Sequence, residues 1–360
     1  MPPERIIASM NPYMQEIRAT RVERGSVAIW WLGQNGFVFK TPRGVTFSVD
    51  AYLSDSCQAW GRERGLNLAR AVPIFVPPPE FAVDYFLCTH SHQDHADPET
   101  ISALPKQNME FAGPGLACEV FASCGVAAER MRQLYAGGKH TFGDVTAHGA
   151  FALPTDDTDL NHLGFVLEVE DGPRIYMTGD TDYSDLLAGV AKREPQLLIT
   201  CINGGFNNLS HWEAADLARL LRPRAAIPCH YDMFPDNHQN PELFRAGLQY
   251  KAPGVAYQRL QHPDGLTPLF DVPSYDLYAG KIYAVGVFED GSTHHFYDGV
   301  RVTQWDTIAA TASDVNVLAS YLADLIDADA DVSALAVSNV VTISAREPGT
   351  AFTVSKTTTD

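Results

Sequence analysis

The chain has 360 residues, 45% of them hydrophobic, which is enough for a sizeable core and for more than one domain. Its formal net charge of −18 argues against binding duplex nucleic acid, because that affinity comes from basic residues that neutralise phosphates. No stretch resembles a signal peptide or a membrane-spanning helix, so we expect a cytoplasmic protein with no membrane partner.

The first predicted elements are three short β-strands over residues 27–32, 36–40 and 45–50. Glycine-rich and proline-containing turns separate them, which is typical of an antiparallel meander. The third strand ends on Asp50.

A fourth strand is predicted over residues 83–90, where the apolar run "VDYFLCTH" ends on His90. The sequence "THSHQDH" continues directly from it, and a helix then begins with Asp97 as N-cap and Pro98 in its first turn.

The same pattern of a strand ending on a polar residue recurs later in the chain. Strands are predicted over 174–180, ending on Asp180, over 195–202, and over 225–230, ending on His230. Ligands at the strand ends of packed sheets are a common way to build a rigid site.

The composition changes near residue 271, where cysteine disappears and Ser, Thr, Ala, Val and Asp dominate. We expect a main domain over residues 1–270, a linker over 271–275, and a small α+β module over 276–360. The module is predicted to contain a hairpin that turns at 289–291, a helix with Ser313 as N-cap, and further short strands.

The chemistry concentrates in His90, His92, Asp94 and His95. A strand that ends near His90 would project residues 90 and 92 to one side, and the following turn would bring 94 and 95 around. Two imidazoles can then bind one metal, while a carboxylate and an imidazole bind a second. The bland alternative is a solvated polar loop, but the strand-terminal Asp180 and His230 offer further ligands for Zn²⁺, Mn²⁺ or Fe²⁺.

Together, "WWLGQNGFVFK", "VTFSVD", "THSHQDHAD", "TGDTDYS" and "AAIPCHYDMF" resemble the metallo-β-lactamase fold superfamily and, within it, the L-ascorbate-6-phosphate lactonase group. The resemblance covers about residues 25–270 and implies a four-layer αββα sandwich of the α/β class. It also implies two divalent metal ions, Zn²⁺ or Mn²⁺.

The resemblance assigns roles to the individual positions. His90 and His92 would bind the first metal, Asp94 and His95 the second, Asp180 would bridge both, and His230 would complete the second site. In the same way, Asp50 resembles an early aspartate that orients a ligand histidine.

The third ligand of the first metal stays open at this point. His162, which precedes a strand, is the preferred residue, and His148, within a strand, is an alternative. Asp156 or Asp157 are further alternatives, and a carboxylate there would favour Mn²⁺ over Zn²⁺.

We therefore expect a metal-dependent hydrolase of the lactonase type, in which a metal-bound hydroxide opens a small phosphorylated or otherwise anionic lactone. Asp94 would accept the proton, and Tyr183, Asn203 and Asn207 are possible substrate contacts. A phosphodiesterase acting on a nucleotide is the enzymatic alternative.

A third hypothesis treats the hydrolase fold as a scaffold. The C-terminal module loosely resembles modules of phage tail and virion proteins, which suggests a homo-oligomer or a larger virion-like assembly.

Overall fold

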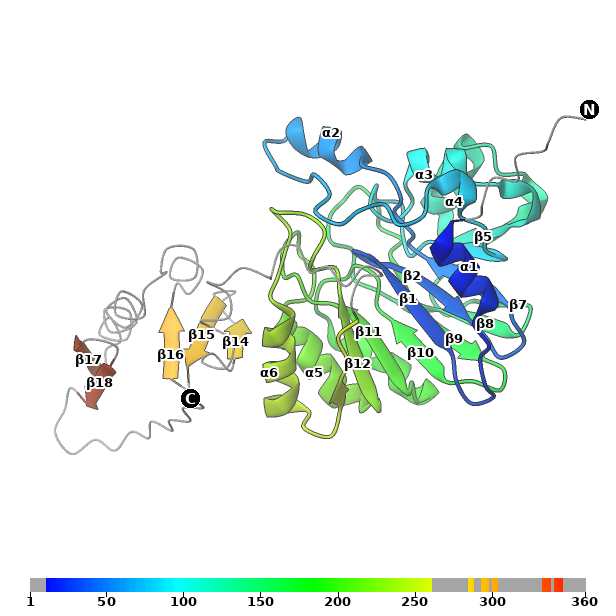
Figure 1. Cartoon of the computed structure of the whole chain (residues 1–360). Helices are drawn as coiled ribbons and strands as arrows, with labels where there is room; N and C mark the ends of the chain where they lie inside the picture. Colours follow the sequence, from blue (N-terminus) through cyan, green and yellow to red (C-terminus); the bar gives the residue numbers. More distant parts are fainter. Residues whose placement is uncertain are drawn as a thin grey trace, which may run out of the picture.

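The protein is described from a computed structural model that covers residues 11–260, together with the strands 284–287, 293–297, 300–303, 332–337 and 340–345. The main body consists of two β-sheets packed face to face, with helices on both outer sides (Figure 1).

The first sheet has six strands in the order β1-β2-β3-β4-β5-β6. These are β1 (Ala28–Gly33), β2 (Gly36–Lys40), β3 (Thr46–Val49), β4 (Tyr85–Leu87), β5 (Glu110–Gly113) and β6 (Met131–Gln133). The first three strands are antiparallel and β3 to β6 run parallel, so the predicted meander is confirmed.

The second sheet has seven strands in the order β13-β12-β11-β10-β9-β8-β7. These are β7 (Lys139–Phe142), β8 (Val145–Phe151), β9 (Leu163–Val169), β10 (Arg174–Met177), β11 (Leu197–Cys201), β12 (Ala225–Cys229) and β13 (Ala256–Tyr257). β7 to β10 are antiparallel, and β10 to β13 run parallel.

Two hydrophobic cores hold the layers together. Phe37 and Phe39 point into the core shared with the second sheet, whereas Val38 points into the core under the helices of the first sheet. This alternation follows from the two-residue period of a strand. The helices of the first sheet are α1 (Pro12–Ala19), α2 (Ser56–Arg62), α3 (Pro98–Ala103) and α4 (Gly115–Ser123), and those of the second are α5 (His211–Leu221) and α6 (Pro241–Lys251).

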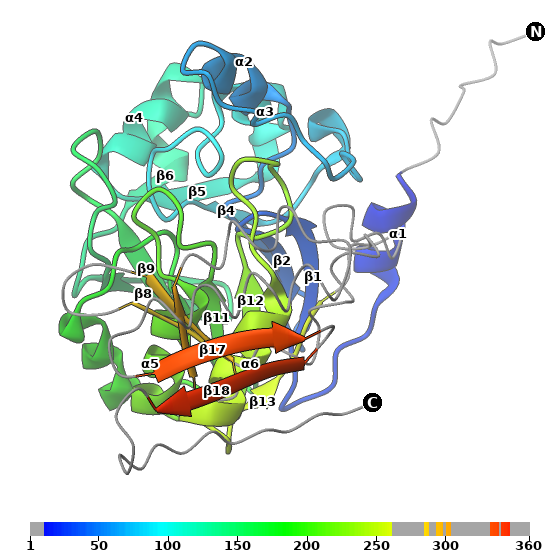
Figure 2. The same ribbon diagram turned by 90° about the vertical axis from the view of Figure 1, so that its left-hand side faces the viewer.

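Figure 2 shows α3 and α4 on the side of β4 to β6, and α5 and α6 on the side of β11 to β13. The predicted four-layer αββα sandwich is therefore confirmed. Short 3-10 helices complete the body: η1 (Pro78–Glu80), η2 (Lys106–Asn108), η3 (Ala128–Arg130) and η4 (Asp185–Arg193).

The predicted strand ends are close to the observed ones except in two strands: the strand predicted over 174–180 ends at Met177, and the one predicted to end at His90 ends at Leu87. The strand expected over 83–90 is only Tyr85–Leu87, because the backbone N–H of Thr89 donates to the Asp50 carboxylate at 2.7 Å instead of extending the ladder. The helix that follows does begin at Pro98, with Asp97 accepting from the N–H groups of Glu99 and Thr100.

The C-terminal strands pair as two separate sheets. β14 (Ala284–Val287), β15 (Thr293–Tyr297) and β16 (Val300–Thr303) form one antiparallel sheet, in which β14 and β15 flank the predicted hairpin turn. β17 (Val332–Val337) pairs antiparallel with β18 (Val340–Ala345). The linker over 271–275 and the helix expected after Ser313 lie outside the described residues.

None of the helices in the described part of the chain combines the length and the apolar character needed to cross a bilayer.

Candidate metal centre

Side chains at the C-terminal ends of four strands meet at one edge of the sandwich. Asp50 follows β3, His90 lies just after β4, Asp180 lies just after β10 and His230 follows β12. Asp50 and His230 have φ angles of 50° and 61°, a left-handed conformation that is uncommon for residues other than glycine. Such strained positions cluster at functional sites.

The first group of side chains is His90, His92 and His162, whose ligand nitrogens lie within 4.8 Å of one another. His162 directly precedes β9, and its Nδ1 lies 3.1 Å from the backbone carbonyl oxygen of Asp180. Because a carbonyl oxygen only accepts, Nδ1 carries the proton and Nε2 keeps the lone pair that a metal needs.

The second group is Asp94, His95 and His230, and Asp180 joins His90 and His95 in a third group that overlaps both others. Asp180 Oδ1 lies 3.3 Å from His95 Nε2 and 3.2 Å from His230 Nε2. Asp94 Oδ2 lies 3.3 Å from His230 Nε2. Asp180 thus lies between the two groups, as a bridging carboxylate would.

Asp50 orients the His95 ring through its Nδ1 atom. Its buried carboxylate accepts from Asn35 Nδ2 at 2.6 Å and from the Thr89 hydroxyl at 2.6 Å, and it lies 2.9 Å from His95 Nδ1. Since the carboxylate is an acceptor, His95 is held with its proton on Nδ1 and its Nε2 toward Asp180. The resemblance implied that Asp50 orients a ligand histidine; that His95 is a metal ligand stays a prediction.

The surroundings give the two groups opposite protonation preferences. Burial and the neighbouring histidines lower the pKa of His90 well below its usual value, and burial lowers the pKa of His162. For His230, burial acts in the same direction, but the carboxylates of Asp180 and Asp94 outweigh it and raise the pKa to about 9. Burial opposes ionisation of both carboxylates, yet the adjacent imidazoles lower their pKa values. His90 and His162 are therefore neutral, whereas the second group pairs carboxylates with imidazolium when no metal is bound.

The residues present fit divalent metal ions. Four buried atoms have no hydrogen-bond partner among the described residues, namely Nε2 of His90, His95 and His162, and Oδ1 of Asp180. Buried polar atoms are normally satisfied, and leaving one unpaired costs about 1–3 kcal/mol. Converging imidazole nitrogens and carboxylate oxygens are the donor set of Zn²⁺, Mn²⁺ or Fe²⁺.

Of the alternatives for the third ligand, only His162 lies in the first group. His148 lies within β8, and its Nε2 is 2.9 Å from a carboxylate oxygen of Glu168, away from the other histidines. Asp156 lies at the edge, with Oδ1 3.3 Å from His92 Nε2, and the side chain of Asp157 is exposed.

The three possible substrate contacts lie in the neighbouring loops. Tyr183 is half-buried, three residues after Asp180. Asn203 is buried, while Asn207 is exposed and its side-chain amide donates to the carbonyl oxygen of Thr155 at 2.8 Å. Asn207 therefore ties the loop after β11 to the loop before β9.

Two residues of the centre were missed by the sequence reasoning. Gln34 donates from Nε2 to Asp94 Oδ2 at 2.8 Å, and Asn208 donates from Nδ2 to Asp180 Oδ2 at 2.7 Å. The sequences around Gln34 and Asn208 are typical of ordinary turns. The signals for a nearby site were weak: glycines next to Gln34, and several asparagines around Asn208.

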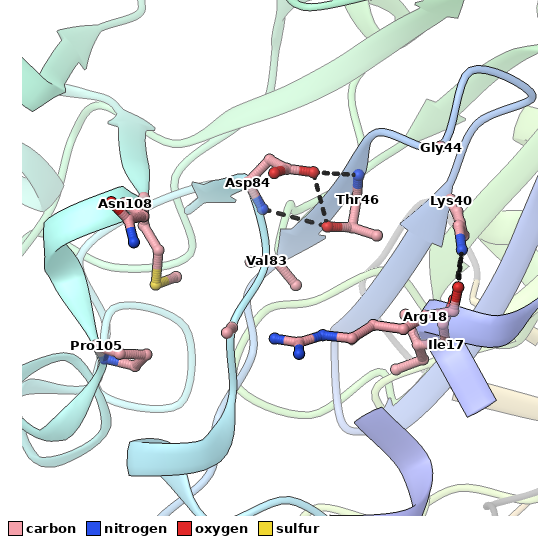
Figure 3. Close-up of a pocket in the computed structure, with 11 residues that line it drawn as sticks. Ile17, Arg18, Lys40, Gly44, Thr46, Val83, Asp84, Pro105 and Asn108 are labelled. Atoms are coloured by element: carbon pink, nitrogen blue, oxygen red, sulfur yellow. Dashed lines mark hydrogen bonds between the residues drawn. The ribbon is translucent and has the colours of Figure 1, made fainter. Parts of the chain in front are cut away.

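A cavity of about 380 Å³ lies at the opposite end of the first sheet (Figure 3). Thr46 and Asp84 mark the starts of β3 and β4 there, and Lys40 donates to the carbonyl oxygens of Ile17 and Arg18 at the end of α1. Because the histidines lie beyond the other ends of the same strands, this cavity is not part of the candidate centre.

A family model described as the beta-lactamase superfamily domain matches residues 28–230, more than half of the chain. The chain belongs to the beta-lactamase superfamily. This confirms the resemblance on which the fold was predicted.

Individual relatives agree with that family. A UPF0173 metal-dependent hydrolase of Anaeromyxobacter sp. (strain K) is 28% identical over 250 residues, which cover 64% of this chain and 84% of the relative. A protein of Salmonella heidelberg (strain SL476) named "probable L-ascorbate-6-phosphate lactonase" is 25% identical over 288 residues, which cover 68% and 80% of the two chains.

A solved metallo hydrolase from the archaeon Ignicoccus hospitalis has the same fold, with a TM-score of 0.53 at 18% identity over 66% of this chain and 95% of that one. The phage-like character of the C-terminal module stays a prediction.

Proposed function

We propose that the protein is a metal-dependent hydrolase that opens a small lactone, with two divalent cations, Zn²⁺ or Mn²⁺, as cofactors. One observation carries the proposal: two overlapping groups of imidazoles and carboxylates, with four buried ligand atoms that lack hydrogen-bond partners among the described residues. The names of the relatives, metal-dependent hydrolase and lactonase, support the reaction class.

The ligands divide between two positions. His90, His92 and His162 would hold the first cation, and Asp94, His95 and His230 the second, with Asp180 shared by both. When bound, such a pair of cations lowers the pKa of a water toward neutrality and polarises the carbonyl oxygen of a substrate.

In this proposal Asp94 accepts the proton. Its side chain is 18% exposed, whereas Asp180 is 7% exposed and His95 is fully buried. Its contacts with Gln34, His95 and His230 all use Oδ2, which leaves Oδ1 to take the proton of an attacking water. The adjacent imidazoles lower the pKa of Asp94 against the effect of burial, which keeps its carboxylate ionised, the form that can accept a proton.

The reaction class is tested with two substrate panels, one of lactones and one of phosphodiesters, with the protein loaded with Mn²⁺ or Zn²⁺. We expect ring opening of lactones and no phosphodiester cleavage. Cleavage of phosphodiesters without ring opening would replace the proposal by the nucleotide alternative. A folded protein that takes up no metal would instead favour the scaffold hypothesis.

Oligomerisation is a separate proposal. We expect a homo-oligomer that depends on residues 276–360, and a chain truncated after Phe270 tests it. An unchanged oligomeric state together with full activity would exclude an assembly role for the C-terminal residues.

A further inference from the structure

The loops around the candidate metal centre contain no lysine or arginine. We name them the mouth loops, and they comprise residues 51–57, 91–97, 152–162, 178–186, 202–210 and 231–240. Their exposed carboxylates are those of Asp55, Asp156, Asp157, Asp185 and Asp236. Among the residues that the structure describes, these loops are therefore negatively charged.

The segment over residues 58–71 follows the 51–57 loop, and its three arginines have other partners. This segment joins the mouth through the bond from the Ala71 N–H to the Met233 carbonyl oxygen. Arg62 donates to Gln58, and the guanidinium of Arg64 lies over the ring of Trp60.

Arg70 donates to the backbone carbonyl oxygens of Tyr52, Ser54, Val72 and Pro73. Its guanidinium is thus occupied in holding the loop, and it is not available to a ligand at the mouth.

The mouth loops also contain exposed apolar side chains. Leu160 is 70% exposed and Phe206 is 44% exposed. Phe206 has a φ angle of 54°, an outlier conformation for a bulky residue, and the neighbouring Asn207 has a φ of 56°, which asparagine tolerates. The bonds from Asn208 to Asp180 and from Asn207 to the 152–162 loop hold this conformation next to the centre. A strained loop that keeps an aromatic ring in solvent beside a site indicates a ligand contact.

We propose that the substrate is a neutral lactone with an apolar substituent, which Phe206 and Leu160 contact. Phosphate recognition relies on arginine, lysine, backbone N–H donors or metal ions, and a substituent phosphate that lies away from the two proposed cations would meet five exposed carboxylates in the mouth loops. This inference rests on the proposed lactonase function and replaces the anionic substrate expected from the sequence.

The test compares two lactones with the same ring, one with an aliphatic chain and one with a phosphate in its place, using the full-length, metal-loaded protein. We expect kcat/KM for the aliphatic lactone to be at least about tenfold higher. Preference for the phosphorylated lactone would overturn the inference. Opening of neither lactone would refute the proposed function itself, and the inference with it.

Phe206→Ser tests the contact directly. We expect it to lower kcat/KM for the aliphatic lactone about tenfold, mainly through KM, and to leave an unsubstituted ring unaffected. Leu220→Ser is the matched control, because Leu220 is 37% exposed at the far end of α5. Equal losses in both variants, or no loss for Phe206→Ser, would contradict the role of Phe206.

A second inference concerns Gln34, whose side chain is fully buried in the centre. Its backbone has a φ of 52°, and its carbonyl oxygen accepts from the N–H of His230 at 2.9 Å. Nε2 lies 2.8 Å from Asp94 Oδ2 and 3.0 Å from His230 Nε2, while Oε1 is buried without a partner among the described residues.

The amide nitrogen thus contacts the same two atoms that we propose bind the second cation. A cation bound to these two atoms would repel the NH₂ group of Gln34 and attract its carbonyl oxygen. A rotation of the amide by half a turn exchanges the positions of Nε2 and Oε1. From this geometry we infer that Gln34 Oε1 helps to bind the second metal ion.

Calorimetric titration of the metal-free, full-length protein with Mn²⁺ tests this inference. In Gln34→Met, which keeps the length but removes the polar atoms, we expect the second binding event to weaken about 10–100-fold while the first is unchanged. Gln34→Glu keeps an oxygen and should retain both events. Wild-type affinities in Gln34→Met would overturn the inference. If Gln34→Met fails to fold, Gln34→Asn takes its place, because the shorter side chain cannot bring its amide oxygen to the second metal ion. We expect the same selective weakening of the second binding event. Wild-type affinities in Gln34→Asn would also overturn the inference.

Discussion

Replacing Asp50 with asparagine changes the protonation of His95 without removing a side chain. The Asp50 carboxylate takes part in four hydrogen bonds: Asn35 Nδ2 at 2.6 Å, Thr89 N at 2.7 Å, Thr89 Oγ1 at 2.6 Å and His95 Nδ1 at 2.9 Å. An asparagine oxygen in place of Oδ1 still accepts from the Thr89 N–H. Its NH₂ group, in place of Oδ2, faces three donors.

The loss of folding free energy depends on how many of these three donors can find another arrangement. The Thr89 hydroxyl can rotate and accept, which leaves Asn35 and His95 opposed to the new NH₂ group. Each buried, unpaired donor costs about 1–3 kcal/mol, so the two together cost about 2–6 kcal/mol. If His95 gives up its Nδ1 proton and keeps the proton on Nε2, Nδ1 becomes an acceptor and about 1–3 kcal/mol remains. This tautomer lacks the Nε2 lone pair that we propose binds metal.

We therefore expect Asp50→Asn to lower the free energy of unfolding by about 1–3 kcal/mol in urea, and to weaken metal binding about 10–100-fold by calorimetry. Asp97→Asn is the matched control. Asp97 is equally buried and accepts from Ser56 and from the first turn of α3, but it contacts no histidine. It should change stability only. Wild-type metal affinity in Asp50→Asn would refute the reasoning about the His95 tautomer.

Three further predictions concern the ligands. His92→Ala and Asp180→Asn should each abolish hydrolysis while circular dichroism shows an intact fold, and wild-type turnover by either variant would disprove the assigned site. His162→Ala should lower the metal content of the purified protein and Asp157→Ala should not, which metal analysis checks; the opposite result would make the carboxylate the third ligand. In the metal-free protein, the pKa of His230 is raised from 6.5 to about 9. Its stabilising contribution is therefore complete below pH 6.5 and is lost as the pH rises to about 9, on the order of 3 kcal/mol. Urea unfolding at about pH 6 and about pH 9.5 measures it, and equal stability at both would contradict the ion pairs.

The positions of the proposed ligands near the strand ends could be predicted because each pattern is local. An apolar run that stops at a histidine or an aspartate identifies the strand and a polar residue one to three positions beyond its end, as for His90, Asp180 and His230. The parallel strands then bring these ends to one edge, which the sequence shows only through the repeated pattern. His162 could be preferred over His148 for the same reason, since it precedes a strand instead of lying within one.

The partners of those ligands could not be predicted, because they depend on side-chain contacts between distant segments. Gln34 and Asp94 are 60 residues apart, and Asn208 and Asp180 are 28 apart. A turn-forming sequence gives the conformation of a loop but not the direction of a glutamine or asparagine amide within it. Among three nearby asparagines, the sequence reasoning selected Asn203 and Asn207, whereas Asn208 is the one that contacts a proposed ligand.

The unpaired atoms of the centre connect stability to function. Two of the buried ligand atoms, Nε2 of His90 and of His162, have neither a hydrogen bond nor an ion pair among the described residues, and each would cost about 1–3 kcal/mol, a noticeable share of the roughly 5–15 kcal/mol by which a domain is stable. The cost falls on the residues that the strands hold rigidly in place, so the fold cannot relax to satisfy them. A ligand that binds only the folded state and supplies the missing partners removes this cost and adds a stabilisation that grows with its concentration. Metal loading should therefore raise the unfolding temperature, and Asp180→Asn, which loses the shared carboxylate, should lose most of that increase.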